Sequence, residues 1–119
     1  MSNLFDETVY RSLCSELGDA DTVEVLALFF ADTVGKMTSL ATNSETRPHI
    51  MLVAHSIKSS AATFGFAELS RLAQELEAGS TTFEPRKLRE SILELQRVFA
   101  ASHQYAQANL LNADLATAK

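Results

Sequence analysis

Cysteine, tryptophan, proline and glycine are all scarce in this chain of 119 residues. The single cysteine, Cys14, cannot close a disulfide within the chain, and no Cys/His cluster offers a zinc site. With only 4 Gly and 2 Pro, turn signals are few, so the chain must form a few long elements. We therefore expect helices, no resident metal or other cofactor, and a reducing compartment.

Long apolar runs and an excess of basic residues are missing as well. The longest apolar stretch, residues 25–31, is too short to span a bilayer, and the first residues lack the basic and apolar regions of a signal peptide. The net charge of −5 repels phosphate backbones and anionic membrane surfaces. We therefore expect a cytoplasmic protein that partners neither nucleic acid nor a membrane.

The length corresponds to one domain, because domains most often have about 100 to 150 residues. Hydrophobic residues make up 46% of the chain and charged residues 21%, which is the composition of an ordinary globular protein with one core. We expect residues 1–119 to form a single domain, which excludes a multidomain enzyme.

Apolar residues recur at helical spacing in five segments, and no segment alternates with the period of a strand. The expected helices cover residues 6–17, 21–42, 47–64, 66–78 and 85–110. Because the connections are short, neighbouring helices should be antiparallel. The pattern predicts an all-α fold, most simply an up-down four-helix bundle with a short extra helix at the N-terminus.

Polar residues mark the starts of two of these helices. Asp6 is an acceptable N-cap of the first helix. Asp21 with Glu24 three residues later has the form of a capping box, which predicts the start of the second. The spacing within the first helix predicts a buried stripe of Val9, Leu13 and Leu17.

Of the three histidines, only His55 lies on a face suited to chemistry. A helix turns by about 100° per residue, so His55, two positions before the apolar Ile57, points away from the apolar stripe and toward water. His49 and His103 have no ligand-spaced partner one turn away, and we expect both at the surface.

The segment that begins at His55 reads His-Ser-Ile-Lys-Ser-Ser-Ala-Ala-Thr-Phe-Gly. It resembles the signature H-x-L-K-G-x-x-x-x-x-G of histidine phosphotransfer (HPt) domains, with matches at His55, Lys58 and Gly65. Ser59 is a departure, since the family usually has Gly there. Residues 66–77 resemble the family's next helix, usually G-A-x-x-L-x-x-x-x-x-x-L-E, and end on Glu77.

The resemblance implies a phosphorelay intermediate of two-component signalling. His55 would accept a phosphoryl group and transfer it to or from a receiver-domain aspartate of a response regulator or hybrid histidine kinase. Lys58 would stabilise the charge of the phosphoryl group, since its ammonium lies one helical turn away. Glu77 matches the position where the family places the partner that orients the histidine.

The same resemblance implies a docking surface for the receiver around the histidine. Met51 and Leu52 would make apolar contacts, and the small side chains of Ser59 and Ala62 would leave the histidine accessible. Mg²⁺ would belong to the receiver's own acidic pocket. The sequence has no Gly-rich phosphate loop and no nucleotide-binding boxes, so we expect a carrier without ATP-dependent kinase activity.

An alternative of a different class remains open at this point. A helical bundle could use the face around Met51, Leu52 and His55 purely to bind or sequester a signalling partner, independently of phosphorylation. The two hypotheses differ in whether His55 carries a phosphoryl group.

Overall fold

The computed structural model of the chain describes residues 4–41 and 46–111. All regular elements in these residues are helices, so the predicted all-α class is confirmed. No helix among them is long and apolar enough to cross a membrane. The elements are α1 (Glu7–Leu17), α2 (Asp19–Ala41), α3 (Arg47–Phe64), α4 (Ala67–Gly79), α5 (Pro85–Ala106) and a short π-helix, η1 (Gln107–Leu111).

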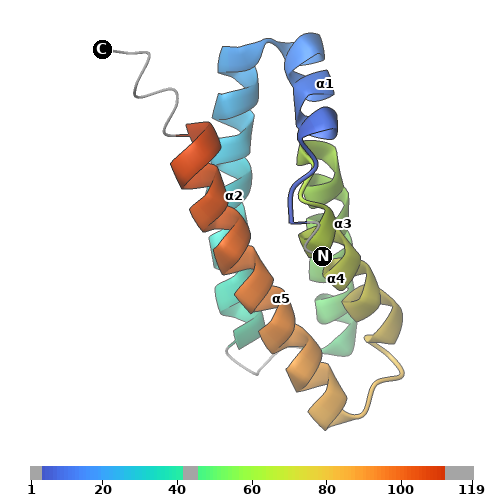
Figure 1. Cartoon of the computed structure of the whole chain (residues 1–119). Coiled ribbons are helices and arrows are strands. Elements are labelled where there is room, and N and C mark those ends of the chain that lie inside the picture. The colour runs from blue at the N-terminus through green and yellow to red at the C-terminus, as the bar shows by residue number, and fades with distance from the viewer. Residues whose placement is uncertain (1–3, 42–45, 112–119) are drawn as a thin grey trace.

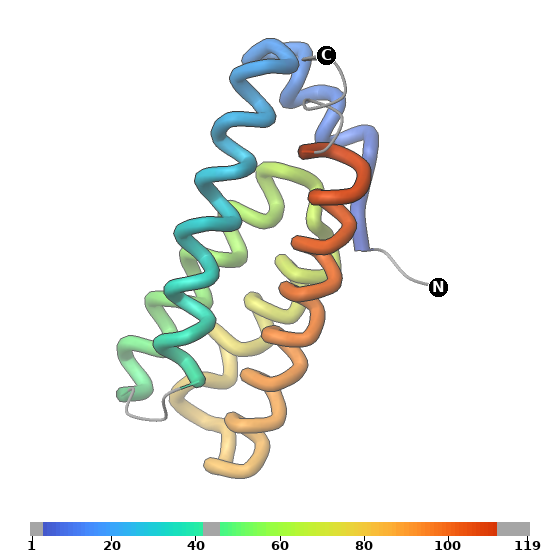
Figure 2. The backbone as a smooth tube through the Cα atoms, turned by 90° about the vertical axis from the view of Figure 1, so that its left-hand side faces the viewer, coloured from blue at the N-terminus to red at the C-terminus, as the bar shows by residue number. Residues whose placement is uncertain are grey.

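The helices α2 to α5 lie along a common long axis, and successive helices run in alternating directions (Figure 1). In the view turned by 90°, α2 and α5 lie in front of α3 and α4 (Figure 2). The short α1 lies at one end, where it contacts α2 and α3. This arrangement places α4, which carries Glu77, beside α3, which carries His55 and Lys58.

The first helix begins as its sequence predicts. The Asp6 carboxylate accepts hydrogen bonds from the backbone N–H groups of Thr8 (3.0 Å) and Val9 (3.3 Å). These bonds satisfy N–H groups that have no partner within the helix, which is why aspartate is favoured at this position.

The start of α2 differs from the prediction. The helix begins at Asp19, so the capping box predicted for Asp21 and Glu24 is wrong. The carbonyl of Gly18 accepts bonds from the N–H (3.0 Å) and the hydroxyl (2.7 Å) of Thr22, which starts the helix two residues earlier. Asp21 lies instead in the first turn, where a negative charge interacts favourably with the helix dipole.

The C-terminal end of the last predicted helix also differs. The α-helical pattern of α5 stops at Ala106, and residues 107–111 continue in the wider π-helical turns of η1. The last residue of the predicted helix 21–42 lies outside the described residues, as do residues 112–119.

The buried face of α1 matches the predicted stripe only at Leu13, which is partly buried against the core. Val9 is 37% exposed and Leu17 is 44% exposed, whereas Tyr10 is buried. The cause is Phe5, which precedes the helix. Its ring packs against the rings of Tyr10 and Tyr105, with ring centroids 5.6 Å and 5.0 Å apart. This contact turns the Tyr10 side of α1, rather than the Val9 side, toward the core.

His103 also differs from the prediction, because it is not a surface residue. Its ring is half-buried and stacks on Phe30, with ring centroids 4.6 Å apart and planes 7° from parallel. Phe30 is almost completely buried and also contacts the rings of Phe66 and Phe99. His103 therefore forms part of the wall of the aromatic core.

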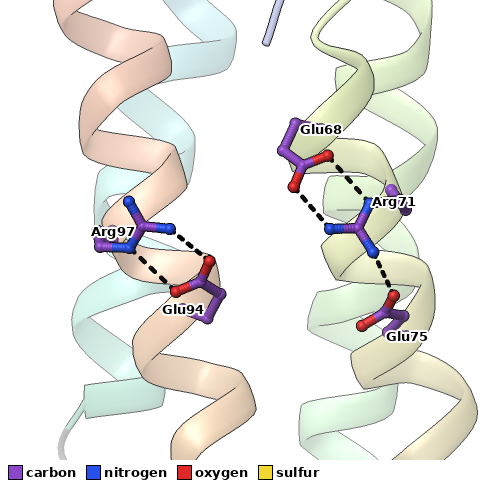
Figure 3. Close-up of polar contacts among 5 residues, drawn as sticks. All are labelled: Glu68, Arg71, Glu75, Glu94 and Arg97. Carbon is purple, nitrogen blue, oxygen red and sulfur yellow. Dashed lines mark hydrogen bonds and ion pairs between the residues drawn. The ribbon is translucent and has the colours of Figure 1, made fainter. Parts of the chain in front are cut away.

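The exposed surfaces of α4 and α5 carry ion pairs within each helix (Figure 3). Arg71 on α4 lies between Glu68 and Glu75, and Arg97 on α5 pairs with Glu94. The hydrogen bonds from Arg71 lower the pKa of Glu68. Such exposed pairs typically contribute little to stability, so this surface keeps the helices solvated rather than holding them together.

Candidate functional site

His55 projects from the middle of α3 into solvent. The helix buries Ile57 and the rest of its apolar stripe against the core, and the His55 side chain, on the opposite side of the helix, is 58% exposed. The exposed position predicted from the helical spacing is therefore confirmed. An exposed imidazole in the middle of a rigid helix is accessible to a large partner while its backbone stays fixed.

The carboxylate of Glu77 on α4 links His55 to Lys58. Glu77 Oε2 lies 2.8 Å from His55 Nδ1, and Glu77 Oε1 lies 2.8 Å from Lys58 Nζ. The structure thus brings together the three residues that the sequence singled out, although Glu77 is 22 residues from His55 along the chain.

The turn at Gly65 is what returns the chain toward His55. Gly65 ends α3 in the left-handed conformation (φ 90°), and the next residue, Phe66, donates its N–H to the carbonyl of Ala61 (2.9 Å). The Gly65 carbonyl accepts from the N–H of Asp6 (2.7 Å), which attaches the start of α1 to the same turn. The conformation and this close approach both require glycine.

The contact with Glu77 decides which nitrogen of the neutral His55 ring carries the proton. The hydrogen bond from Lys58, followed by that from His55, lowers the pKa of Glu77, so the carboxylate is ionised near neutral pH. An ionised carboxylate can only accept hydrogen bonds, so Nδ1 of His55 must be the donor. In the neutral ring, Nε2 then carries the lone pair and can act as a nucleophile.

Apolar side chains lie exposed around this group of residues. Leu52 is 66% exposed and Met51 38% exposed, and the small residues Ser59 and Ala62 are exposed on the same helix.

The group around His55 lies on an open surface rather than in a deep cavity. A cavity of about 640 Å³ lies at the α1 end of the molecule, and its lining includes Tyr10, Cys14 and Tyr105. His55, Lys58 and Glu77 do not line it. Burial there raises the pKa of Tyr10 to about 12. No cluster of three or more metal-ligating side chains occurs in the described part of the chain. The geometry around His55 suits a macromolecular partner better than a small substrate.

Comparison with protein-family models matches residues 24–108 to the Hpt domain. The match contains most of α2 and all of α3, α4 and α5, and it therefore includes His55 and Glu77. No curated protein and no solved structure matches the chain.

Proposed function

Because the chain belongs to the Hpt domain family, whose members carry phosphoryl groups on histidine in two-component phosphorelays, we propose that His55 is its phosphorylated residue. The observation that carries the proposal is the hydrogen bond between Nδ1 and the ionised Glu77 carboxylate. It orients the exposed ring and leaves Nε2 as the attacking atom.

The transfer step follows from this protonation state. The Nε2 lone pair attacks the phosphorus of an aspartyl phosphate on a receiver domain, a P–N bond forms, and the bond from phosphorus to the aspartate oxygen breaks. The aspartate leaves as a carboxylate. The ring keeps its Nδ1 proton and becomes positively charged, and the negative charge of Glu77 stabilises it at 2.8 Å. The reverse sequence passes the group to another receiver.

Lys58 supplies positive charge near the phosphoryl group. Phosphoryl transfer proceeds through a loose transition state with charge on the equatorial oxygens, which a nearby ammonium stabilises. The Lys58 side chain is 30% exposed and Glu77 holds it, one helical turn from His55. Glu77 therefore has two roles in the proposal, since it orients the nucleophile and keeps the ammonium within reach.

The proposed partner is the receiver domain of a response regulator or a hybrid histidine kinase. The receiver would dock on Met51, Leu52, Ser59 and Ala62 of α3. In this proposal the receiver supplies Mg²⁺, and the chain itself binds no cofactor, nucleic acid or membrane and has no kinase activity. It acts in the cytoplasm as a single domain, residues 1–119, in which α2 to α5 form an antiparallel four-helix bundle.

The proposal is tested by labelling with a phosphorylated receiver domain. The chain should acquire an acid-labile, base-stable phosphate, and His55→Gln should abolish the label while the circular dichroism spectrum stays unchanged. His49→Gln, which changes an exposed histidine on the same helix, is the matched control and should keep the label. Full labelling of His55→Gln would rule out the proposal.

Lys58 provides a second arm of the same experiment. Lys58→Ala should slow transfer about 10- to 100-fold, the effect of losing one hydrogen bond from a charged group, and should change receiver affinity much less. Lys87→Ala, at an exposed position on α5, should change neither. The adaptor alternative predicts the opposite pattern, in which the wild-type chain acquires no label and His55→Gln binds the partner with unchanged affinity.

A further inference from the structure

Ser70 joins the two helices that form the site. Its hydroxyl on α4 donates a hydrogen bond of 2.9 Å to the backbone carbonyl of Lys58 on α3. Lys58 is the same residue whose ammonium binds Glu77 (2.8 Å). Ser70 therefore attaches α4 to the backbone of α3 at a residue that takes part in the bridge.

Ser70 and Glu77 also share a face of α4. They are seven residues apart, close to two helical turns, so both side chains point toward α3. We propose that Ser70 is a positioning residue that sets the register of α4 against α3 and so keeps Glu77 in contact with His55. This inference rests on the proposed role of His55.

The contacts of Glu77 tolerate little movement between the helices. Both are 2.8 Å long, so lengthening either of them by about 1 Å would take it beyond hydrogen-bonding distance. Ala54 and Ala61 on α3 and Ala73 on α4 are fully buried. These small side chains let the two helices approach closely, and the hydrogen bond from Ser70 adds a directional contact to their packing.

The Ser70 hydroxyl can be removed without damage to the fold. Ser70 is only partly buried and borders an open cavity of about 290 Å³ that Ala62 and Gln74 also line. In Ser70→Ala, the Lys58 carbonyl keeps its hydrogen bond within α3, and so it is not left without a partner. The variant should therefore fold.

The inference is tested on the full chain with Ser70→Ala and Ser70→Thr. In Ser70→Ala, the ¹⁵N NMR signals of the His55 ring should move toward those of a free imidazole, because Nδ1 is no longer held as the donor. Transfer from a phosphorylated receiver should slow about three- to tenfold, the factor expected for one neutral hydrogen bond. Ser70→Thr keeps the hydroxyl and should restore both properties.

Ser102→Ala is the matched control. The Ser102 hydroxyl also donates to a backbone carbonyl (2.8 Å to Val98), but within α5 and away from the bridge. Its removal should change neither the ring signals nor the transfer rate. Should Ser70→Ala unfold, Ser70→Cys repeats the test with a side chain of similar size and a weaker donor.

A double variant decides whether Ser70 acts through Glu77. If it does, Ser70→Ala should cause no further loss of rate in a Glu77→Ala background. Unchanged ring signals in Ser70→Ala, or an undiminished loss of rate in the Glu77→Ala background, would overturn the inference. The ring signals need no phosphoryl donor, so a failure of the proposed function in the His55→Gln experiment is distinguishable from a failure of the role of Ser70.

Discussion

Glu77 is the residue on which the site depends, because its two oxygens serve two different partners. The hydrogen bond from Lys58, and after it that from His55, holds the pKa of Glu77 below its ordinary value of 4.5, although partial burial acts in the opposite direction. In the unfolded chain the pKa returns to its ordinary value. The ionised bridge therefore stabilises the fold above that value, and this contribution is lost as the pH falls through the lowered pKa.

This pKa can be measured by following the Glu77 side-chain carboxyl carbon by NMR during an acid titration. We expect a midpoint below 4.5 in the wild-type chain. Lys58→Ala should move the midpoint upward, because it removes the largest cause of the shift. Lys87→Ala should leave it in place. A wild-type midpoint at or above 4.5 would contradict the assignment.

Residues close together in the sequence were easier to identify than residues that meet only in space. His55 and Lys58 are one turn apart on one helix, so their spacing alone predicts that they are neighbours. Glu77 came only from the family resemblance. Ser70 is twelve residues from the carbonyl it binds and matches no signature position, so it could be found only when the register of α4 against α3 was known.

At the scale of helices, the starts and ends were predicted where one residue decides them. Asp6 and Gly65 act through their own side chain or conformation, and both do what the sequence indicates. The start of α2 depends instead on Thr22 and Gly18 bonding across the preceding turn, which outweighs the pattern at Asp21. The buried face of α1 depends on Phe5, which lies before the helix and outside its periodicity.

Two glycines should respond in opposite ways to alanine. At Gly65, which has φ +90°, a Cβ would lie 2.6 Å from the backbone oxygen of Asp6, so Gly65→Ala should destabilise the fold by about 2 kcal/mol or more. Gly35 lies within α2, and a Cβ there would meet nothing within 4 Å. Gly35→Ala should therefore stabilise the fold by about 0.5 to 1 kcal/mol.

Urea unfolding of both variants, followed by circular dichroism, measures these differences in free energy. The comparison tests the turn that connects α3 to α4, because the same substitution is made in both cases. If Gly65→Ala lowered the free energy of unfolding no more than Gly35→Ala does, the left-handed turn would not be required.

At the scale of the whole molecule, the aromatic core connects helices that the sequence pattern could only assign one by one. Phe30 of α2 contacts Phe66 beside α4 and both Phe99 and His103 of α5. The spacing of apolar residues along α5 does not predict that His103 belongs to this core, because its imidazole is polar and lies beside the apolar stripe. Its burial follows from the position of α2, which no local pattern contains.

The core and the charged surface of α4 and α5 should therefore differ sharply in their contribution to stability. Phe30 is 1% exposed, and Phe30→Ala removes a ring that four others contact, so it should cost about 3 to 5 kcal/mol in the free energy of unfolding. The Arg71 side chain is 53% exposed, so Arg71→Ala should cost far less than Phe30→Ala although it breaks two ion pairs. Urea unfolding at low and at high salt distinguishes the two, because salt screens the exposed pairs and should reduce only the effect of Arg71→Ala. A loss at Arg71 as large as that at Phe30, and insensitive to salt, would mean that the surface pairs, rather than the aromatic core, hold α4 and α5 in place.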